Sequence, residues 1–410
     1  MKRFKLITAG SLALAFASMA SAQTFVKLTG STAYRKATYD AIVKSLNTPK
    51  GAAIGGTTAD FTGDAQAVIT GTLKSGPSAG QAVVIQTAFG GSVGGLNVLT
   101  HGLTTIPGTS FDSLHTWISS TTNTLTPLTV NGDGTISGAT ILTSANFEGA
   151  STADTSMSDS FQSSSPFPTP SLLEENPAGN GVGVVQFFWV KGLQSPDVPA
   201  GSYNALTNIS PLQAQLLLAA GELPLSLFTG VASDSSVDVI LLGRNNDSGT
   251  RLDAEAEPGY GFGQLENQYQ TVGSPITSLV NVGDNGYASG GTLATALKTS
   301  ITAGTVDDAG NPFILVGYLG KSDKNTAVAG GGVALKYAGF DGTVDTNIEN
   351  GQYTFWAYEH AYYKSGLGTV KQNAINLYSN ELRVTDAVQS GILLTAMGVS
   401  RSIEGGPVSP

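Results

Sequence analysis

The chain has 410 residues, no cysteine and a formal net charge of −10, and charged residues make up only 12% of it. The negative charge argues against nucleic acid or an anionic membrane as a partner, because both repel an acidic surface. Without cysteine the chain forms no disulfide and no thiolate metal site. Its length exceeds one hydrophobic core, so we expect two domains.

The first 22 residues have the pattern of a secretory signal peptide. A positive stretch that ends at Lys5 precedes an apolar run over residues 6–19, and Ala20-Ser21-Ala22 is a small-residue cleavage site. The apolar run is short for a membrane span, and no second one follows. We therefore expect a mature protein that is periplasmic or secreted and is not embedded in a membrane. Its net charge is −13, because the leader carries three basic residues.

Two strands near the N-terminus each end in a turn of small residues that starts a helix. Residues 24–28 predict a strand, Thr29-Gly30-Ser31-Thr32 a turn, and residues 33–46 a helix by their apolar spacing. The strand over 81–87 runs into Gly90-Gly91-Ser92-Val93-Gly94-Gly95 in the same way. At such a turn the first helical N–H groups are unpaired and the helix dipole adds positive charge, so both turns suit an anion.

Residues 100–150 differ from their surroundings. They are rich in threonine, glycine and asparagine, and Asn131-Gly132-Asp133-Gly134 is a hairpin signal. We predict a β-rich insertion in this range and a surface loop over 160–180, where serine and proline dominate.

The rest of the chain alternates strands and helices. Ser210-Pro211-Leu212-Gln213 predicts a capped helix start, and Gly221 its end. The other predicted elements are a crossover strand over 182–190, a helix over 292–297, a strand over 313–318, an aromatic strand over 353–363 that crosses back, and a helix over 369–382. The alternation indicates an α/β fold, with parallel sheets expected.

The clearest chemical signal is the turn Arg244-Asn245-Asn246-Asp247-Ser248-Gly249-Thr250-Arg251, directly after an apolar strand over 237–242. Arg244 offers a charge-assisted bond to an anion, and Ser248 and Thr250 offer hydroxyl donors. Gly249 lets a ligand approach the backbone closely. The structural alternatives are an arginine tied to a carboxylate and an ordinary helix N-cap at Ser248.

Four segments in order resemble motifs of the phosphate-binding protein of bacterial phosphate ABC importers, a type 2 periplasmic binding protein. They are Leu28-Thr29-Gly30-Ser31-Thr32, Gly91-Ser92-Val93-Gly94-Gly95, Asp154-Thr155-Ser156-Met157-Ser158-Asp159 and Arg244 to Thr250. They are similar to the family's opening Gly-Ser-Ser-Thr turn, its Gly-Ser-x-Gly-Gly loop, its Asp-x-x-x-Ser-Asp segment and its Arg-x-x-x-Ser-Gly-Thr turn. The resemblance covers most of the mature chain, with low identity between the motifs.

The resemblance implies two α/β lobes joined by two crossover strands, with inorganic phosphate bound between them and passed to an ABC importer permease. It implies lobe I over residues 23–181, including the β-rich insertion, lobe II over 182–350, and a return to lobe I over 351–410. The phosphate ligands that it implies are Ser31, Thr32, Ser92 and Asp159 on the first lobe, and Arg244, Ser248, Gly249 and Thr250 on the second.

Asp159 is the residue that would set the choice of anion. A carboxylate that faces a bound anion repels it unless a proton lies between them. Phosphate keeps a proton at neutral pH and sulfate does not, so an aspartate acceptor selects phosphate. The alternative is a solvated loop aspartate, the commoner place for an aspartate among serines.

Two positions of the arginine turn need separate explanations. Family members commonly carry an acidic residue two places after the arginine, and this chain has Asn246 there, so Asp247 is the substitute that we consider for holding Arg244. Arg251 lies in the first helical turn, where positive charge opposes the dipole. It therefore needs a partner, either a bound anion or a carboxylate such as Asp253 or Glu255.

Other chemistry finds no support in the sequence. His101, His115 and His360 lie on unrelated segments, and neither a Gly-x-Ser-x-Gly elbow nor a nucleotide P-loop is present. We expect no metal, no cofactor and no enzymatic activity, and we expect a monomer. Two alternatives stay open. One is a surface or matrix protein that keeps the fold without tight phosphate binding, and the other is a binder of another tetrahedral oxyanion, such as arsenate or sulfate.

Overall fold

The computed structural model describes residues 23–103, 116–176, 178 and 180–410. The predicted signal peptide lies outside the described residues, as do His115 and part of the predicted insertion. Among the helices that are described, none has the length and apolar character needed to cross a bilayer.

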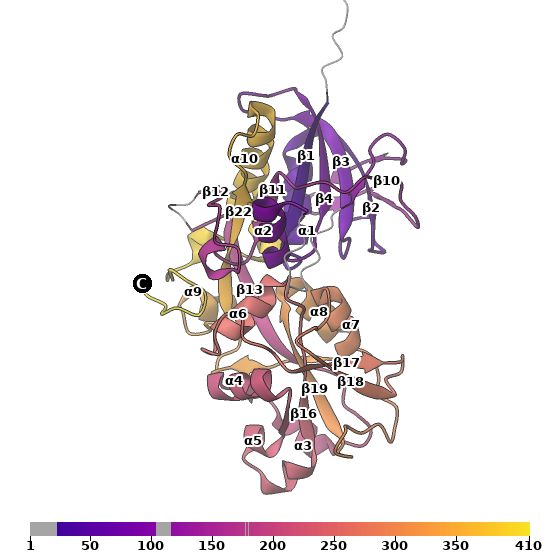
Figure 1. The fold of residues 1–410 in the computed structure, drawn as a ribbon, viewed down its shortest axis with the longest axis vertical. Helices are drawn as coiled ribbons and strands as arrows, with labels where there is room; N and C mark the ends of the chain where they lie inside the picture. The colour runs from indigo at the N-terminus through magenta and orange to yellow at the C-terminus, as the bar shows by residue number, and fades with distance from the viewer. Residues whose placement is uncertain (1–22, 104–115, 177, 179) are drawn as a thin grey trace, which may run out of the picture.

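The described elements form two lobes that share one mixed sheet of fifteen strands (Figure 1). We call the upper group in Figure 1 the first lobe and the lower group the second lobe. The first lobe contains β1 (Thr24–Gly30), α1 (Arg35–Lys44), β2 (Leu46–Ile54), β3 (Gln66–Leu73), β4 (Ala82–Ala88), α2 (Ser92–His101), β11 (Thr155–Ser158), β12 (Leu173–Glu174) and α10 (Thr369–Val384).

The second lobe carries most of the remaining helices. It contains α3 (Ala200–Ala205), α4 (Pro211–Ala220), β15 (Glu222–Pro224), α5 (Ser226–Thr229), β16 (Asp238–Leu242), α6 (Gly249–Ala256), β17 (Gln268–Val272), β18 (Ser278–Gly283), α7 (Gly290–Leu297), β19 (Phe313–Gly320) and α8 (Lys321–Ala329). Shorter elements complete the chain: β14 (Asn208–Ile209), β20 (Val333–Ala334), β21 (Lys336–Tyr337), α9 (Asp345–Glu349) and β23 (Gly391–Ile392).

Two strands carry the sheet from one lobe to the other. They are β13 (Gly183–Lys191) and β22 (Trp356–Tyr363), and every residue of both is buried. The first half of β13 pairs with β22 and its second half with β19, while the last four residues of β22 pair with β11. Both strands that the sequence predicted to cross therefore do so. The exact lobe boundaries stay a prediction.

Strand directions follow from these crossings. β4, β1 and β11 run parallel in the first lobe, and β16 runs parallel to β19 in the second. The crossover strands, the β2–β3–β4 meander and β15 pair antiparallel with their neighbours. The expectation of parallel sheets is thus right for only part of the sheet, which is mixed.

The α/β class and the β-rich insertion are confirmed. The described part of the insertion contains β5 (Trp117–Ile118), β6 (Thr126–Pro127), β7 (Thr129–Val130), β8 (Ile136–Ser137), β9 (Thr140–Ile141) and β10 (Phe147–Glu148). β7 and β8 form the hairpin around the predicted Asn-Gly-Asp-Gly turn. β6 and β9 pair with β2 and so extend the outer edge of the first lobe.

Helix α4 shows how closely local signals fix its ends. The Ser210 hydroxyl accepts a bond from the Gln213 N–H, and the Gln213 side chain accepts one from the Ser210 N–H. Gly221 ends the helix with φ of 77°, a left-handed conformation that glycine adopts without strain. The predicted capping signature is therefore confirmed.

Candidate functional site

Five helices begin where the lobes meet: α1 and α2 from the first lobe, and α6, α7 and α8 from the second (Figure 1). Each starts within a few residues of a strand end, because strand, small-residue turn and helix recur along the chain. Helix N-termini present unpaired N–H groups and partial positive charge. Their convergence makes the junction favourable for an anion.

The turns before α2 and α6 touch directly across the junction. The Gly94 N–H donates to the Asp247 carbonyl oxygen at 3.1 Å. Gly91 has φ of 120°, and a Cβ at this position would lie 2.2 Å from the same oxygen. Glycine is therefore required at Gly91 for both backbone conformation and approach.

Arg244 crosses the junction from the second lobe. It follows β16 and is only 1% exposed. Its Nε donates to the Tyr287 carbonyl at 3.1 Å, and its Nη2 donates to the Ala288 carbonyl at 3.3 Å and to Thr32 Oγ1 at 3.4 Å. Among the described residues no carboxylate lies within ion-pair distance of this guanidinium. The structural alternative, an arginine tied to a carboxylate, is therefore wrong for Arg244.

Asp159 lies on the opposite wall and is 1% exposed, so the alternative of a solvated loop aspartate is wrong. Its N–H donates to Ser92 Oγ at 3.2 Å, and its Oδ1 has no hydrogen-bond partner among the described residues. A Cβ on Gly249 would lie 1.6 Å from that Oδ1, so the carboxylate rests against the Gly249 backbone. Asp159, Ser92 and Gly249 thus form one contact across the lobes.

The predicted ligands Ser31, Ser248 and Thr250 lie in the same region. They differ in the hydrogen bonds that their hydroxyl groups make. Ser31 is fully buried, and its Oγ accepts from the Tyr34 N–H at 3.2 Å. Ser248 caps α6 by accepting from the Arg251 N–H at 3.2 Å, which is the structural alternative foreseen for it. This bond does not use the hydroxyl hydrogen of Ser248. Thr250 is buried in the first turn of α6, and no bond described here joins its hydroxyl to the others.

Arg35 is a residue of this region that the sequence analysis did not single out. It is the first residue of α1 and is 7% exposed, yet no hydrogen bond or ion pair joins its guanidinium to any other described residue. Its Nη2 reaches across the junction, to 3.6 Å from where a Cβ on Gly291 in α7 would stand. Its sequence position, at the start of a helix, gave no signal that set it apart.

Two buried carboxylates face the two arginines. Burial raises the pKa of Asp159 to about 6, although Ser92 and Arg244 act in the opposite direction. Burial also raises the pKa of Asp323, in the first turn of α8, against the effect of Arg35 and Arg244. Burial lowers the pKa of Arg244 itself. These two arginines and two carboxylates are therefore close enough to act on one another without forming ion pairs.

Asn246 and Arg251, the two positions of the arginine turn discussed above, are each held by a carboxylate. Asn246 donates to Asp284 Oδ2 at 3.1 Å, so it holds a neighbouring loop and not Arg244. Asp247 lies against Gly94, and the carboxylates that act on Arg244 are Asp323 and Asp159. Arg251 forms ion pairs with Glu255 at 2.8 Å and with Asp284, which confirms Glu255 as its partner.

An open pocket of about 430 Å³ lies beside this junction, on the outer side of α6. Ser248 is the one predicted ligand that lines it, together with Val93, Asn246, Arg251, Leu252 and Leu265 among others. The remaining predicted ligands lie behind it, in the closed contact between the lobes. The junction is therefore shut where the sequence placed the anion.

The chain resembles known proteins only at low sequence identity. No family model and no curated protein matches the chain. Among solved structures, it is similar to a protein from Clostridium perfringens described as a phosphate ABC transporter substrate-binding protein with bound phosphate. The identity is 13%, the TM-score is 0.48, and the match covers 90% of this chain and 99% of that one.

Two further solved structures match over a similar span. An ABC-type phosphate transport receptor from Vibrio cholerae shares 12% identity with a TM-score of 0.41, over 90% of this chain and 99% of that one. PstS from Borrelia burgdorferi shares 10% identity with a TM-score of 0.35, over 90% and 98%. Phosphate-transport proteins thus recur among the structures similar to this chain.

Proposed function

We propose that the chain is a secreted solute-binding protein that holds inorganic phosphate between its lobes and delivers it to an ABC importer. The observation that supports this most is the pairing of Arg244, a buried cation without an ion pair, with Asp159, a buried carboxylate whose Oδ1 has no partner among the described residues. The proposed ligands are Ser31, Thr32, Ser92, Asp159, Arg244, Ser248, Gly249 and Thr250, to which we add Arg35.

The charges of the junction fit a protonated oxyanion. A buried cation without a partner is unfavourable, and an anion that accepts from Arg244 and Arg35 removes that penalty. A carboxylate beside the same anion tolerates it only when the anion donates a proton to it. A tetrahedral oxyanion that keeps a proton at neutral pH meets both requirements, so phosphate fits better than sulfate.

Calorimetry on the mature protein tests the proposal. We expect heat of binding and a rise in melting temperature with phosphate, and a much weaker response with sulfate. A response to arsenate equal to that to phosphate would identify a general protonated-oxyanion site. The absence of any heat or thermal shift at millimolar phosphate contradicts the proposal.

A second candidate function follows from the closed contact between the lobes. The Asp159 carboxylate rests against Gly249, so the lobes must separate by the width of an ion before phosphate can enter. A protein that never opens would keep the fold without binding, and its β-rich insertion would be the functional part. Small-angle scattering distinguishes the two, because a binding protein should contract when phosphate is added and a closed protein should not.

Replacement of Asp159 by asparagine should abolish the discrimination against sulfate. Asparagine offers an N–H₂ donor where the carboxylate repels a fully ionised anion, so sulfate affinity should rise by about tenfold or more. Competition calorimetry with phosphate and sulfate measures this change. The wild-type protein should itself accept sulfate better at about pH 5 than at pH 7.5, because Asp159 has a pKa of about 6 and is protonated at the lower pH.

The asparagine variant supplies the control for that pH effect. Its relative affinity for sulfate should not change over the same pH range, since the titrating group is gone. Unchanged anion selectivity in this variant removes Asp159 from the site.

Replacement of Arg35 by methionine should separate stability from binding. The guanidinium has no bond to another described residue to lose, and methionine fills a similar volume without a buried charge, so the melting temperature without ligand should stay level or rise. Phosphate affinity should fall about tenfold or more, because one charge-assisted bond is lost. Arg383→Met is the control, since Arg383 lies on α10 and bonds only to nearby Asn380 among the described contacts. A loss of stability with unchanged affinity contradicts this role.

A further inference from the structure

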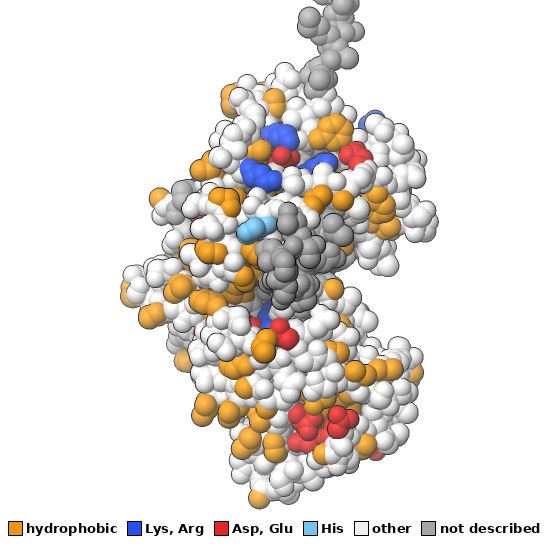
Figure 2. All heavy atoms as spheres, in the orientation of Figure 1, with side chains coloured by type: hydrophobic (Ala, Val, Ile, Leu, Met, Phe, Trp, Pro, Cys, Tyr) orange, Lys and Arg blue, Asp and Glu red, His pale blue; other side chains and the backbone are white. Residues whose placement is uncertain are grey.

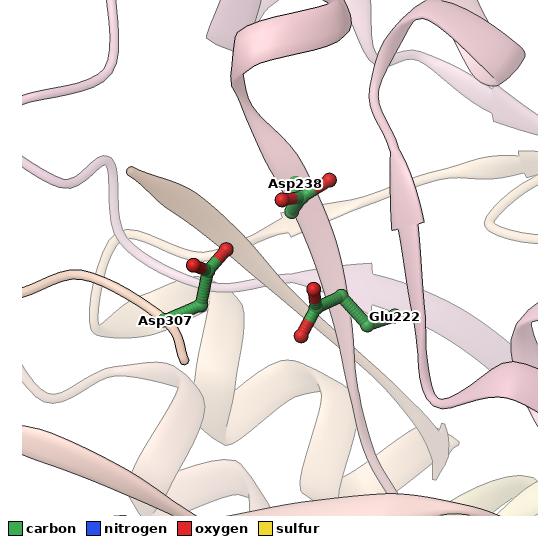
Figure 3. Close-up of side chains that lie close together, drawn as sticks. All are labelled: Glu222, Asp238 and Asp307. Atoms are coloured by element: carbon green, nitrogen blue, oxygen red, sulfur yellow. The ribbon is translucent and has the colours of Figure 1, made fainter. Parts of the chain in front are cut away.

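Three carboxylates converge in the second lobe, away from the junction. Glu222 begins β15, Asp238 begins β16, and Asp307 lies in the loop before β19, and one oxygen from each lies within 4.8 Å of the others (Figure 3). The second lobe also presents acidic side chains on the face drawn in Figure 2. Asp238 lies at the opposite end of β16 from Arg244, so this cluster is separate from the proposed phosphate site.

Strand pairing places two of the three side chains on one face. Glu222 lies opposite Ile240 and Pro224 opposite Asp238 in the antiparallel pair, so Glu222 and Asp238 are diagonal neighbours. The carboxylates of Asp307 and Glu222 point toward the strand that carries Asp238 (Figure 3). The fold therefore directs three like charges to one point.

Asp307 provides the observation that points to a ligand. It is only 8% exposed, and its Oδ2 has no hydrogen-bond partner among the described residues. Its Oδ1 is held by the N–H groups of Ala309 at 2.9 Å and Asn311 at 2.8 Å, so the side chain is fixed with its second oxygen directed into the cluster. A buried carboxylate oxygen left without a donor is unfavourable unless a cation lies beside it.

Among the residues that the structure describes, none supplies such a cation by an ion pair. None of the ion pairs between described residues involves Glu222, Asp238 or Asp307. The neutral donors nearby are Tyr269, which donates to Glu222 at 3.2 Å, and Asn311, which donates to Asp238 at 2.9 Å. Burial, and then the neighbouring carboxylate of Asp307, raise the pKa of Asp238 to about 6. The described residues therefore offer the three carboxylates neutral donors and no cation.

We propose that Glu222, Asp238 and Asp307 bind a calcium ion that ties β15, β16 and the loop before β19 together. All donors are oxygen atoms, which suits a hard cation. Two oxygens bound to one Ca²⁺ can lie at most about twice the Ca–O distance of roughly 2.4 Å apart, and the three carboxylate oxygens meet this limit because all lie within 4.8 Å of one another. Water completes the coordination shell, since the site is open on the Glu222 side. The proposal departs from the expectation of no metal that was drawn from the sequence.

The test is thermal unfolding of the mature protein, freed of metal by a chelator, with CaCl₂ or MgCl₂ added. We expect about 1 mM Ca²⁺ to raise the melting temperature by on the order of 2–5 °C, and Mg²⁺ to have a much smaller effect. No shift with Ca²⁺ up to about 10 mM, or an equal shift with Mg²⁺, overturns the assignment.

Variants link the shift to the site. Asp307→Asn keeps the acceptor for Ala309 and Asn311 but removes the charge, so it should lose the calcium response without losing stability in the chelator. Asp341→Asn is the matched control, because Asp341 accepts the Thr343 N–H at 2.8 Å in a similar turn outside the cluster. A calcium shift that persists in the Asp307 variant overturns the proposal. Phosphate binding should be unchanged in both variants, so the outcome is independent of the proposed function.

Discussion

Replacement of Arg244 by glutamine should reduce phosphate affinity by on the order of 10²- to 10³-fold. The arginine crosses the junction without a carboxylate partner, and in our proposal its charge is compensated only by the bound anion. Truncating one partner of a buried, charge-assisted interaction costs about 2–5 kcal/mol, and each 1.4 kcal/mol is tenfold in affinity. Arg244→Lys should be intermediate, since lysine keeps the charge but loses the planar fork. Titration calorimetry with phosphate measures all three proteins.

Arg251 is the contrasting control, seven residues away on the same turn. It is tied to Glu255, Glu266 and Asp284, and without it the buried carboxylates of Glu255 and Glu266 lose their countercharge. Arg251→Gln should therefore lower the melting temperature more than Arg244→Gln does, while leaving phosphate affinity in the folded protein within a few fold. If Arg244→Gln binds phosphate as the wild type does, Arg244 is not a ligand.

The sequence predicted the elements of the junction well because each is encoded locally. A strand that ends in small residues and starts a helix is visible at Gly30, Gly91 and Ser248, and the helix caps at Ser210 and Ser248 are present in the structure. The crossover strands were visible because most of their residues are apolar or aromatic, with Gln186 and Lys191 the exceptions in β13 and Glu359 and His360 in β22. Such features depend on neighbours in the chain, which a sequence shows directly.

The parts that the sequence did not predict depend on contacts between distant segments. Arg35 and Asp323 are ordinary helix-start residues until the lobes bring them beside Arg244. Glu222, Asp238 and Asp307 are 85 residues apart at the extremes and share no spacing that marks a metal site. Asp284, which follows the strand β18 that the sequence did not predict, is the partner of Asn246 and a further partner of Arg251.

Replacement of Gly249 by alanine should prevent the lobes from closing and reduce phosphate affinity by about two orders of magnitude or more. The added methyl would lie 1.6 Å from Asp159 Oδ1 and 2.7 Å from Ser92 Cβ. Either the Asp159 carboxylate turns away or the lobes separate, and each outcome removes ligands from the site. Helix propensity alone acts in the opposite direction, since alanine is favoured over glycine in a helix by about 0.5–1 kcal/mol. A loss of binding would therefore come from the clash of the methyl group across the lobes and not from helix propensity.

Gly201→Ala separates the steric effect from the propensity effect. Gly201 lies in the first turn of α3, and a Cβ there meets nothing within 4 Å. This variant should keep full phosphate affinity and melt at the same or a slightly higher temperature. Calorimetry and small-angle scattering on both variants distinguish the possibilities: the Gly249 variant should stay extended when phosphate is added, while the Gly201 variant should contract. Contraction and wild-type affinity in the Gly249 variant would show that phosphate is not bound at the contact between Gly249, Ser92 and Asp159, because closure there leaves no room for the methyl group.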